Sequence, residues 1–222
     1  MPMFDTIILV TGPTEQPVLA SALKAHRPDL IVEAVETLPQ LLAIRASVLQ
    51  RARLIAFATT VIVPASVLEG LGFGAYNFHP GPPSYPGWAP AHFALYDGAR
   101  EFGATAHAMV EQVDAGPIVA VELFPIPDSA SATELEGLAY ARLAKMFWDL
   151  AKPIATQVRA LPALELDWSG PKNTRRRYQS LCDIPLDIAA EELVRRIKVF
   201  GGNDFDVCPT VRLHGVAFRI AS

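Results

Sequence analysis

The sequence predicts an α/β fold: a Rossmann-like open, mostly parallel sheet with flanking helices, followed by a short C-terminal helix and β-ribbon. Short, wholly apolar segments alternate with helical patterns, as in sheets that helices cover on both faces. Hydrophobic residues make up 51% of the 222 residues, which is enough to bury a core. At roughly 150 residues per domain, this length favours one large domain, alone or with a short appendage.

The first elements alternate between strand and helix. Thr6–Val10 is an apolar run that ends at a Thr-Gly-Pro turn, so it favours a buried strand. A helix is predicted over residues 17–25 and a second strand over residues 30–36. The leucine spacing then predicts a helix over residues 39–50.

The third strand is predicted over residues 54–58, which are all apolar. Residues 64–71 favour a short helix, because proline stands at their start and glycines near their end. Ala75–His79 is the fourth predicted strand. This strand–helix alternation is typical of an open, mostly parallel sheet.

The pattern changes beyond the fourth strand. Residues 105–110 and 118–124 favour two strands around a tight turn. Thr133 is expected to begin a long helix with an apolar stripe, and Glu136 stands three residues on as in a capping box. Pro153 is expected to end or kink this helix.

From residue 161 the composition shifts to Pro, Asp, Ser and Gly, and then to the basic run 172–177, which is typical of a linker. An amphipathic helix is predicted over residues 187–200. Residues 207–211 and 216–220 favour a two-stranded ribbon, which is too small to be stable unless it packs on the main body. We therefore expect a main domain over residues 1–160, a linker over 161–183 and a small C-terminal subdomain over 184–222.

Charge and composition argue against several classes of protein. Lys and Arg number 19 against 23 Asp and Glu, a net charge of −4, which gives no support for a nucleic-acid-binding face. No apolar run approaches the roughly 18 residues of a membrane span, and the N-terminus lacks the features of a signal peptide. Cys182 and Cys208 have no metal-like spacing. We therefore expect reduced thiols, no metal and a cytoplasmic location.

Polar residues with catalytic potential surround the fourth strand. Asn77 and His79 lie two apart at its end, so their side chains point to one face. Five prolines in the eleven residues 80–90 make the following loop stiff. Asp114 stands in a tight turn after a later strand. Structural roles remain open for each residue: a capping Asn, a surface His and an Asx-turn Asp.

Taken together, Asn77, His79 and Asp114 can form an acyl-transfer site. The amide of Asn77 and a protonated His79 can stabilise an oxyanion. Asp114 can raise the pKa of His79 or help to remove a proton from an incoming amine. The chain has no serine or cysteine in a nucleophile motif, which favours direct transfer over a covalent intermediate.

Two separated motifs carry a family resemblance. Asn77-Phe78-His79-Pro80-Gly81 with residues 83–87, and residues 103–110 with 113–119, together resemble the signature of the 10-formyltetrahydrofolate-dependent formyltransferases. The family includes enzymes that act on nucleotide-linked amino sugars, methionyl-tRNA and glycinamide ribonucleotide. The resemblance implies that Asn77, His79 and Asp114 are catalytic. It also implies that the formyl group passes directly from the folate co-substrate to an amine through a tetrahedral intermediate, without a metal.

The resemblance also implies where the folate binds. Thr60 and Ile62 would contact the pterin through their backbone, and the loop containing Glu111 and Val113 would close the other side. Two departures are present: the proline-rich loop is one residue shorter than usual, with Pro82 in place of a leucine, and Thr60 stands near a position that relatives often fill with Gly or Arg.

The acceptor amine is expected to belong to a nucleotide-linked amino sugar, because residues 105–119 most resemble the enzymes of that class. Tyr85, Trp88 and His107 flank the expected site as substrate contacts. Pro13 and Glu15 disfavour the phosphate loop of a glycinamide ribonucleotide enzyme. A tRNA acceptor is disfavoured by the net charge and the absence of a basic C-terminal barrel. A homodimer is possible, as in related enzymes.

Two other functional classes remain open. A 10-formyltetrahydrofolate hydrolase would use the same three residues with water in place of the amine. A non-catalytic folate- or nucleotide-binding module would be expected to lack at least one of these residues, and all three are present.

Overall fold

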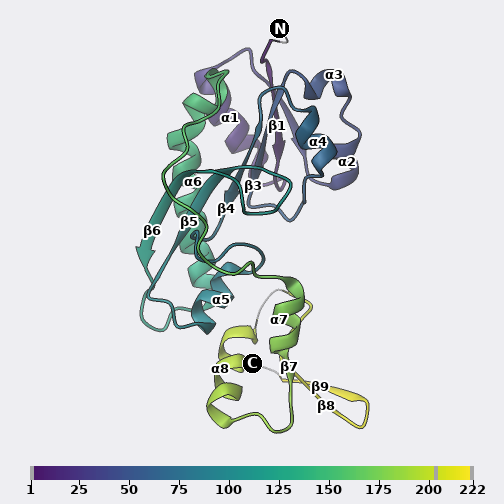
Figure 1. Ribbon diagram of the computed structural model, residues 1–222, viewed down its shortest axis with the longest axis vertical. Helices are drawn as coiled ribbons and strands as arrows, with labels where there is room; N and C mark the ends of the chain where they lie inside the picture. Colours follow the sequence, from purple (N-terminus) through teal and green to yellow (C-terminus); the bar gives the residue numbers. More distant parts are fainter. Residues whose placement is uncertain (1–2, 203–204, 221–222) are drawn as a thin grey trace.

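Six strands form the central sheet of this computed structural model, which describes residues 3–202 and 205–220 (Figure 1). The strands are β1 (Thr6–Val10), β2 (Ile31–Val35), β3 (Ala52–Phe57), β4 (Ala75–His79), β5 (Glu101–Ala108) and β6 (Ile118–Pro125). Their order in the sheet is β2-β1-β3-β4-β5-β6. The pairs among β1 to β4 are parallel, whereas β5 runs antiparallel to both β4 and β6. The predicted open, mostly parallel sheet is confirmed.

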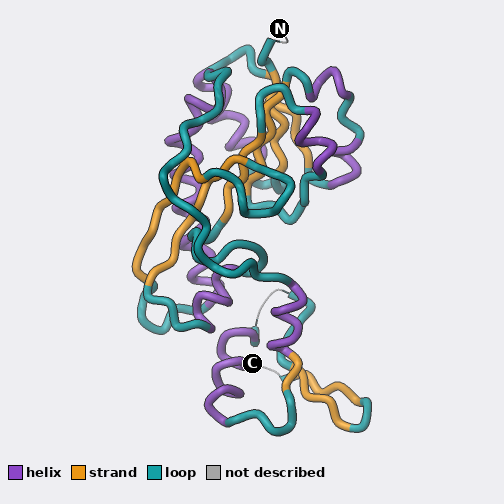
Figure 2. The backbone as a smooth tube through the Cα atoms, viewed as in Figure 1, coloured by secondary structure: helices purple, strands orange, loops and turns teal. Residues whose placement is uncertain are grey.

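Helices cover both faces of the sheet (Figures 1 and 2). They are α1 (Gln16–His26), α2 (Leu38–Leu42), α3 (Ala46–Leu49), α4 (Ala65–Gly70), α5 (Pro90–Tyr96) and α6 (Ala132–Thr156). Along β1, Ile7 and Leu9 pack in the core with α1 and α6, whereas Ile8 and Val10 pack in a second core with α2 to α4. A strand buried on both faces must be apolar throughout, which is the pattern seen in the sequence.

The C-terminal part of the chain adds a smaller unit. It consists of α7 (Arg175–Cys182), β7 (Asp183–Ile184), α8 (Ala190–Phe200), β8 (Thr210–Leu213) and β9 (Val216–Arg219). The predicted ribbon is confirmed as β8 and β9, but β7 joins it to make three strands. Tyr178 and Phe200 are buried against Phe93 of α5, so this unit packs on the main body.

Several predicted elements differ from the observed ones. The single helix expected over residues 39–50 is wrong: α2 and α3 are separate, because Arg45 takes an extended conformation between them. The helix α5, which begins at Pro90, was not predicted. The stretch expected to be a linker over residues 161–183 contains α7, whose first turn Thr174 caps by accepting the N–H of Arg177.

The long helix α6 begins slightly earlier than predicted. Its capping box is formed by Ser131 and Glu134 rather than by Thr133 and Glu136. Pro153 lies inside its last turn and does not end it there. A proline so near the C-terminus removes a single helical hydrogen bond, which the packed helix tolerates.

Residues 1–2, 203–204 and 221–222 of the predicted domain ranges lie outside the described residues. Within the described part of the chain, no helix combines the length and apolar character needed to cross a membrane.

A buried arginine joins the sheet to the end of α6. The side chain of Arg53 in β3 is fully buried and donates hydrogen bonds to three carbonyl oxygens: Phe73 at 3.0 Å, Ile154 at 2.8 Å and Arg159 at 3.1 Å. Burial lowers the pKa of Arg53. The hydrogen bonds compensate for the burial of the guanidinium. They also provide donors to the carbonyl groups of Ile154, in the last turn of α6, and Arg159, just beyond it.

We predict that Arg53→Met destabilises the fold by about 3 kcal/mol, because it leaves three carbonyl groups without their donor. Arg51→Met is the matched control, since the Arg51 side chain is 44% exposed and pairs with Asp5. This control should change stability by less than about 1 kcal/mol. Urea unfolding measures both; equal destabilisation by the two substitutions would contradict the prediction.

Candidate active site

The site is built on the end of β4 and its antiparallel neighbour β5. Asn77 and His79 are two residues apart in β4, so they point to the same face of the sheet. In the register between the strands, Asn77 is opposite His107 and His79 is opposite Thr105. Opposed residues share a face, so β5 adds the His107 imidazole to the two β4 side chains.

The turn between β5 and β6 brings Asp114 to this face. Asp114 has a left-handed backbone with φ of 47°, a conformation that Asp tolerates better than most residues. Gly116 lies so close to the carbonyl oxygen of Ala108 that a Cβ atom would overlap it. The turn can therefore fold back over the strands only with glycine at that position, and this folding places the carboxylate of Asp114 beside Asn77.

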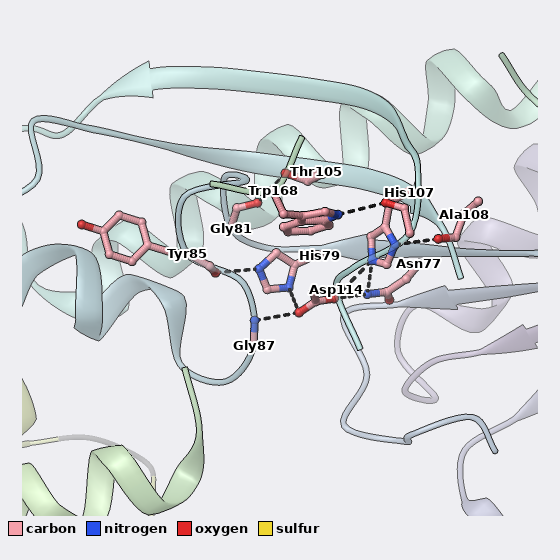
Figure 3. A network of polar contacts seen from close by, with 11 residues as sticks. Asn77, His79, Gly81, Tyr85, Gly87, Thr105, His107, Ala108, Asp114 and Trp168 are labelled. Atoms are coloured by element: carbon pink, nitrogen blue, oxygen red, sulfur yellow. Dashed lines mark hydrogen bonds and ion pairs between the residues drawn. The ribbon is translucent and has the colours of Figure 1, made fainter. Parts of the chain in front are cut away.

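The side chains form one buried polar network (Figure 3). Asn77 Nδ2 donates to Asp114 Oδ1 at 3.2 Å, and His79 Nδ1 lies 3.3 Å from Asp114 Oδ2. His107 Nε2 lies 3.2 Å from both Asp114 Oδ1 and Asn77 Nδ2. The backbone N–H of Gly87 donates to Asp114 Oδ2 at 2.8 Å. The three residues singled out in the sequence are thus brought together.

Asp114 is the negative centre of the network, and its side chain is 3% exposed. Burial by itself would raise its pKa, but His79, His107 and the N–H of Gly87 outweigh that effect and hold the pKa of Asp114 well below its usual value. The carboxylate is therefore ionised across the physiological pH range.

His79 is flanked by two hydrogen-bond acceptors. Nδ1 faces the Asp114 carboxylate, and Nε2 lies 3.1 Å from the carbonyl oxygen of Tyr85. Burial lowers the pKa of His79 below 6.5, while Asp114 and the Tyr85 carbonyl oppose this effect and His107 adds to it. The expectation that Asp114 raises the pKa of His79 is correct for that contact, but burial determines the net direction. The ring is neutral near pH 7. When it gains a proton, each of its two N–H groups faces a hydrogen-bond acceptor.

Of the three expected substrate contacts, Tyr85, Trp88 and His107, only His107 places its side chain in the network. His107 lies inside the network, and its Nδ1 is 2.9 Å from the carbonyl oxygen of Ala108. Tyr85 contributes its backbone carbonyl to His79, while its ring points away from the network (Figure 3). Trp88 packs against Tyr178 and Phe205, and its expected contact with the substrate remains a prediction.

The four expected folate contacts lie on two loops. Thr60 and Ile62 follow β3, and Ile62 is 66% exposed, which is high for a large apolar side chain. Glu111 is exposed and Val113 is partly buried in the turn that carries Asp114. These placements leave both loops accessible to a ligand, and the roles of the four residues remain predictions.

The sequence did not single out Trp168, and it assigned no role to Gly87 within the 83–87 motif. Trp168 lies 5.9 Å from His79 and 5.0 Å from His107, measured between ring centroids, and Nε1 donates to the carbonyl oxygen of Gly116 at 2.9 Å. The available signal was a lone tryptophan in a stretch of Pro, Asp, Ser and Gly. Gly87 acts through its backbone, which no side-chain pattern reveals.

Comparison with known proteins identifies the region that carries the network. Residues 47–142 match the family model described as formyl transferase. The chain therefore carries a formyl transferase domain. This domain contains Asn77, His79, His107 and Asp114, whereas Trp168 lies outside the matched residues.

Relatives of the formyl transferase domain include a methionyl-tRNA formyltransferase of Listeria monocytogenes serotype 4a (strain HCC23). That protein is 32% identical over 161 residues, which cover 70% of this chain and 48% of the relative. The chain spans about half the length of the curated relatives that it matches.

Experimental structures share the fold over almost the whole chain. A sugar N-formyltransferase from Shewanella sp FDAARGOS_354 matches with a TM-score of 0.78 at 16% identity, covering 99% of this chain and 97% of that one. The N-formyltransferase from Helicobacter canadensis in complex with folinic acid and dTDP-3-aminofucose matches with a TM-score of 0.65 at 16% identity, covering 96% and 85%. At these identities the likeness concerns the fold. In the described part of this chain, no group of three or more His, Cys, Asp and Glu residues is arranged to hold a metal.

We predict that His79 titrates below pH 6.5 and that Asp114→Asn lowers its pKa further. The carboxylate stabilises the imidazolium, so its removal leaves the burial effect unopposed by that charge. Asn also tolerates the left-handed backbone at this position. NMR titration of the His79 ring checks both statements. An upward shift in the variant would contradict the assigned interaction.

Proposed function

We propose that this chain transfers a formyl group from 10-formyltetrahydrofolate to the amine of a nucleotide-linked amino sugar. The observation that carries the proposal is the joining of Asn77 and His79 to Asp114 by contacts of 3.2 and 3.3 Å within a formyl transferase domain. Direct acyl transfer needs a group that accepts a proton, a hydrogen-bond donor to the oxyanion and a negative charge that stabilises the protonated base. These three side chains supply one of each.

His79 is the group we assign to proton transfer. Asp114 is a poor base because its pKa is held well below the usual value, whereas His79 is neutral near pH 7. The amine nitrogen forms a bond to the formyl carbon and gives its proton to His79. That proton then passes to N10 of the folate as the bond between N10 and the formyl carbon breaks. The imidazolium formed in between faces the carboxylate of Asp114 at 3.3 Å.

Asn77 is the group we assign to the oxyanion. Its Nδ2 donates to Asp114 and lies 3.2 Å from His107, so both of its N–H groups are directed into the network. Donation to the formyl oxygen requires one of these contacts to be exchanged when the substrates bind. A donor aimed at the developing negative charge contributes most to the rate when it is already held in place.

The loops beside the network support a folate donor. Thr60 and Ile62 lie on one loop and Glu111 and Val113 on the other, and the exposed Ile62 offers an apolar surface for a flat ring. The Helicobacter canadensis N-formyltransferase, which shares this fold, is described in complex with folinic acid. We therefore propose these four residues as contacts of the donor.

An amino-sugar acceptor is supported by the extent of the shared fold and by charge. The match with the Shewanella sugar N-formyltransferase covers 97% of that protein and 99% of this chain, so it extends over α7, α8 and the small sheet of this chain. The net charge of −4 is unfavourable for tRNA. Methionyl-tRNA is the second candidate acceptor, because the curated relatives at 32% identity carry that activity in their names.

An acceptor screen separates these candidates. The protein is mixed with 10-formyltetrahydrofolate and one amine at a time, and the release of tetrahydrofolate is followed by absorbance. We expect release with a nucleotide-linked 3- or 4-amino sugar and none with methionyl-tRNA, glycinamide ribonucleotide or buffer. Release with methionyl-tRNA alone would overturn the acceptor, and equal release without any amine would indicate a hydrolase.

Substitution of the three assigned residues tests the chemistry. Asn77→Ala, His79→Ala and Asp114→Ala are each expected to lower kcat by about 100-fold or more, because each removes a group that acts in the transition state. Folate binding, measured by fluorescence titration, should change little. A variant that keeps nearly wild-type turnover would remove its residue from the mechanism.

The pH dependence tests the role of His79. Neutral His79 is the form that accepts the proton, so kcat/KM should fall as the pH drops through its lowered pKa, below 6.5. The measurement is a rate profile from pH 5 to 8. The profile will need correction for the titration of the amine itself, which a second acceptor with a different amine pKa provides.

A further inference from the structure

The segment between α6 and α7, residues 157–174, runs back along the main sheet and past the site (Figures 1 and 2). We call it the crossing segment. Backbone hydrogen bonds fix it on two sides. Leu164 N donates to Ile118 O at 2.7 Å, and Ser169 N donates to Pro83 O at 3.1 Å. It is therefore attached both to the start of β6 and to the proline-rich loop that follows His79.

The attachment to the proline-rich loop is close. At Gly170 a Cβ atom would overlap the carbonyl oxygen of Ser84, so the two backbones approach as only glycine permits. Asn173 extends the contact: its N–H donates to Pro86 O at 2.8 Å, and its carbonyl oxygen accepts from Trp88 at 2.9 Å. Trp168 lies between these anchor points, so its backbone position is set by contacts on both sides.

The indole of Trp168 touches three parts of the network (Figure 3). Its ring meets His107 at an interplanar angle of 89° and His79 at 69°, both edge-to-face arrangements. Its Nε1 donates to the carbonyl oxygen of Gly116, two residues beyond Asp114. One side chain thus contacts both imidazoles and the turn that holds the carboxylate.

We infer that Trp168 is a positioning residue that forms one wall of the network, holding both imidazoles in place and keeping water from that side of Asp114. The inference concerns the arrangement of the network itself. Only its consequence for turnover rests on the proposed function.

The Trp168 indole affects His79 in two ways: it excludes water from the ring and it orients the ring. The His79 side chain is 6% exposed, and burial is the largest influence on its pKa. Asp114, His107 and the carbonyl of Tyr85 are the other groups that face it. Loss of the indole admits water on one side, so the cost of charging the ring falls and its pKa rises. The edge-to-face contact also orients the ring for proton transfer, an effect that turnover measures.

The first test measures His79 by NMR titration in the absence of substrates. Trp168→Leu keeps much of the bulk but removes the aromatic ring and the N–H donor. We expect the pKa of His79 to rise by about one unit in this variant. Trp168→Phe keeps an aromatic ring but loses the donor to Gly116 and part of the bulk of the indole, so it should shift the pKa in the same direction by less than half as much.

Trp148→Leu is the matched control, because Trp148 lies on α6 with 48% of its surface exposed. This control should leave the titration of His79 unchanged. Thermal unfolding verifies that each variant is folded. If Trp168→Leu does not fold, the smaller shift in Trp168→Phe decides the question. Folded Trp168 variants whose His79 titration equals that of the wild type would overturn the inference.

Turnover gives the second readout. With the acceptor found in the screen, Trp168→Leu is expected to lower kcat about tenfold with little change in the KM of the amine, and Trp168→Phe to recover most of the loss. Failure of the wild-type protein to transfer formyl groups would overturn the proposed function and leave the titration to decide the role of Trp168. Unchanged kcat together with an unchanged titration would overturn that role.

Discussion

The buried carboxylate of Asp114 is the constraint on which the rest of the site depends. An ionised carboxylate that is 3% exposed costs several kcal/mol unless donors surround it. Here the donors are the amide of Asn77 and the backbone N–H of Gly87, with the imidazole nitrogens of His79 and His107 within 3.3 Å. The donors come from two strands and a stiff loop, and the carboxylate comes from a turn. Satisfying one charge therefore fixes the relative positions of four separate segments.

The change of strand direction after β4 makes this arrangement possible. Without β5, Asn77 would have only β3 as a neighbouring strand, and no side chain would lie opposite it on its other side. Because β5 runs back along β4, His107 is opposite Asn77, and the turn that follows can fold over both residues. Three non-glycine residues with left-handed backbone, Ala58, Ala89 and Asp114, lie in the segments around the site. Such conformations cost energy and persist where the surrounding contacts impose them.

The part of the chain that follows α6 contributes to the site and to the packing of α5. The crossing segment brings Trp168 against both imidazoles, and α7 and α8 cover α5 through Tyr178 and Phe200. Within the basic run, Lys172, Arg175 and Arg176 are exposed, but Arg177 packs inward: it donates to Asn173 and its guanidinium lies 4.8 Å from the ring centroid of Phe93. The proline-rich loop is thus held from both sides, by the main sheet and by the C-terminal unit.

The sequence by itself determined the strands of the main sheet and the grouping of Asn77, His79 and Asp114, since apolar runs, strand periodicity and two local motifs are properties of neighbouring residues. It did not determine the break between α2 and α3 or the presence of α7, because weak local propensities are overridden by packing. Only the tertiary structure placed His107 inside the network, packed Trp88 against Tyr178 and brought Trp168 to the site. It also decided that the pKa of His79 lies below its usual value. The pKa of a buried imidazole depends on the solvent and charges around it, and those come from segments far apart in the chain.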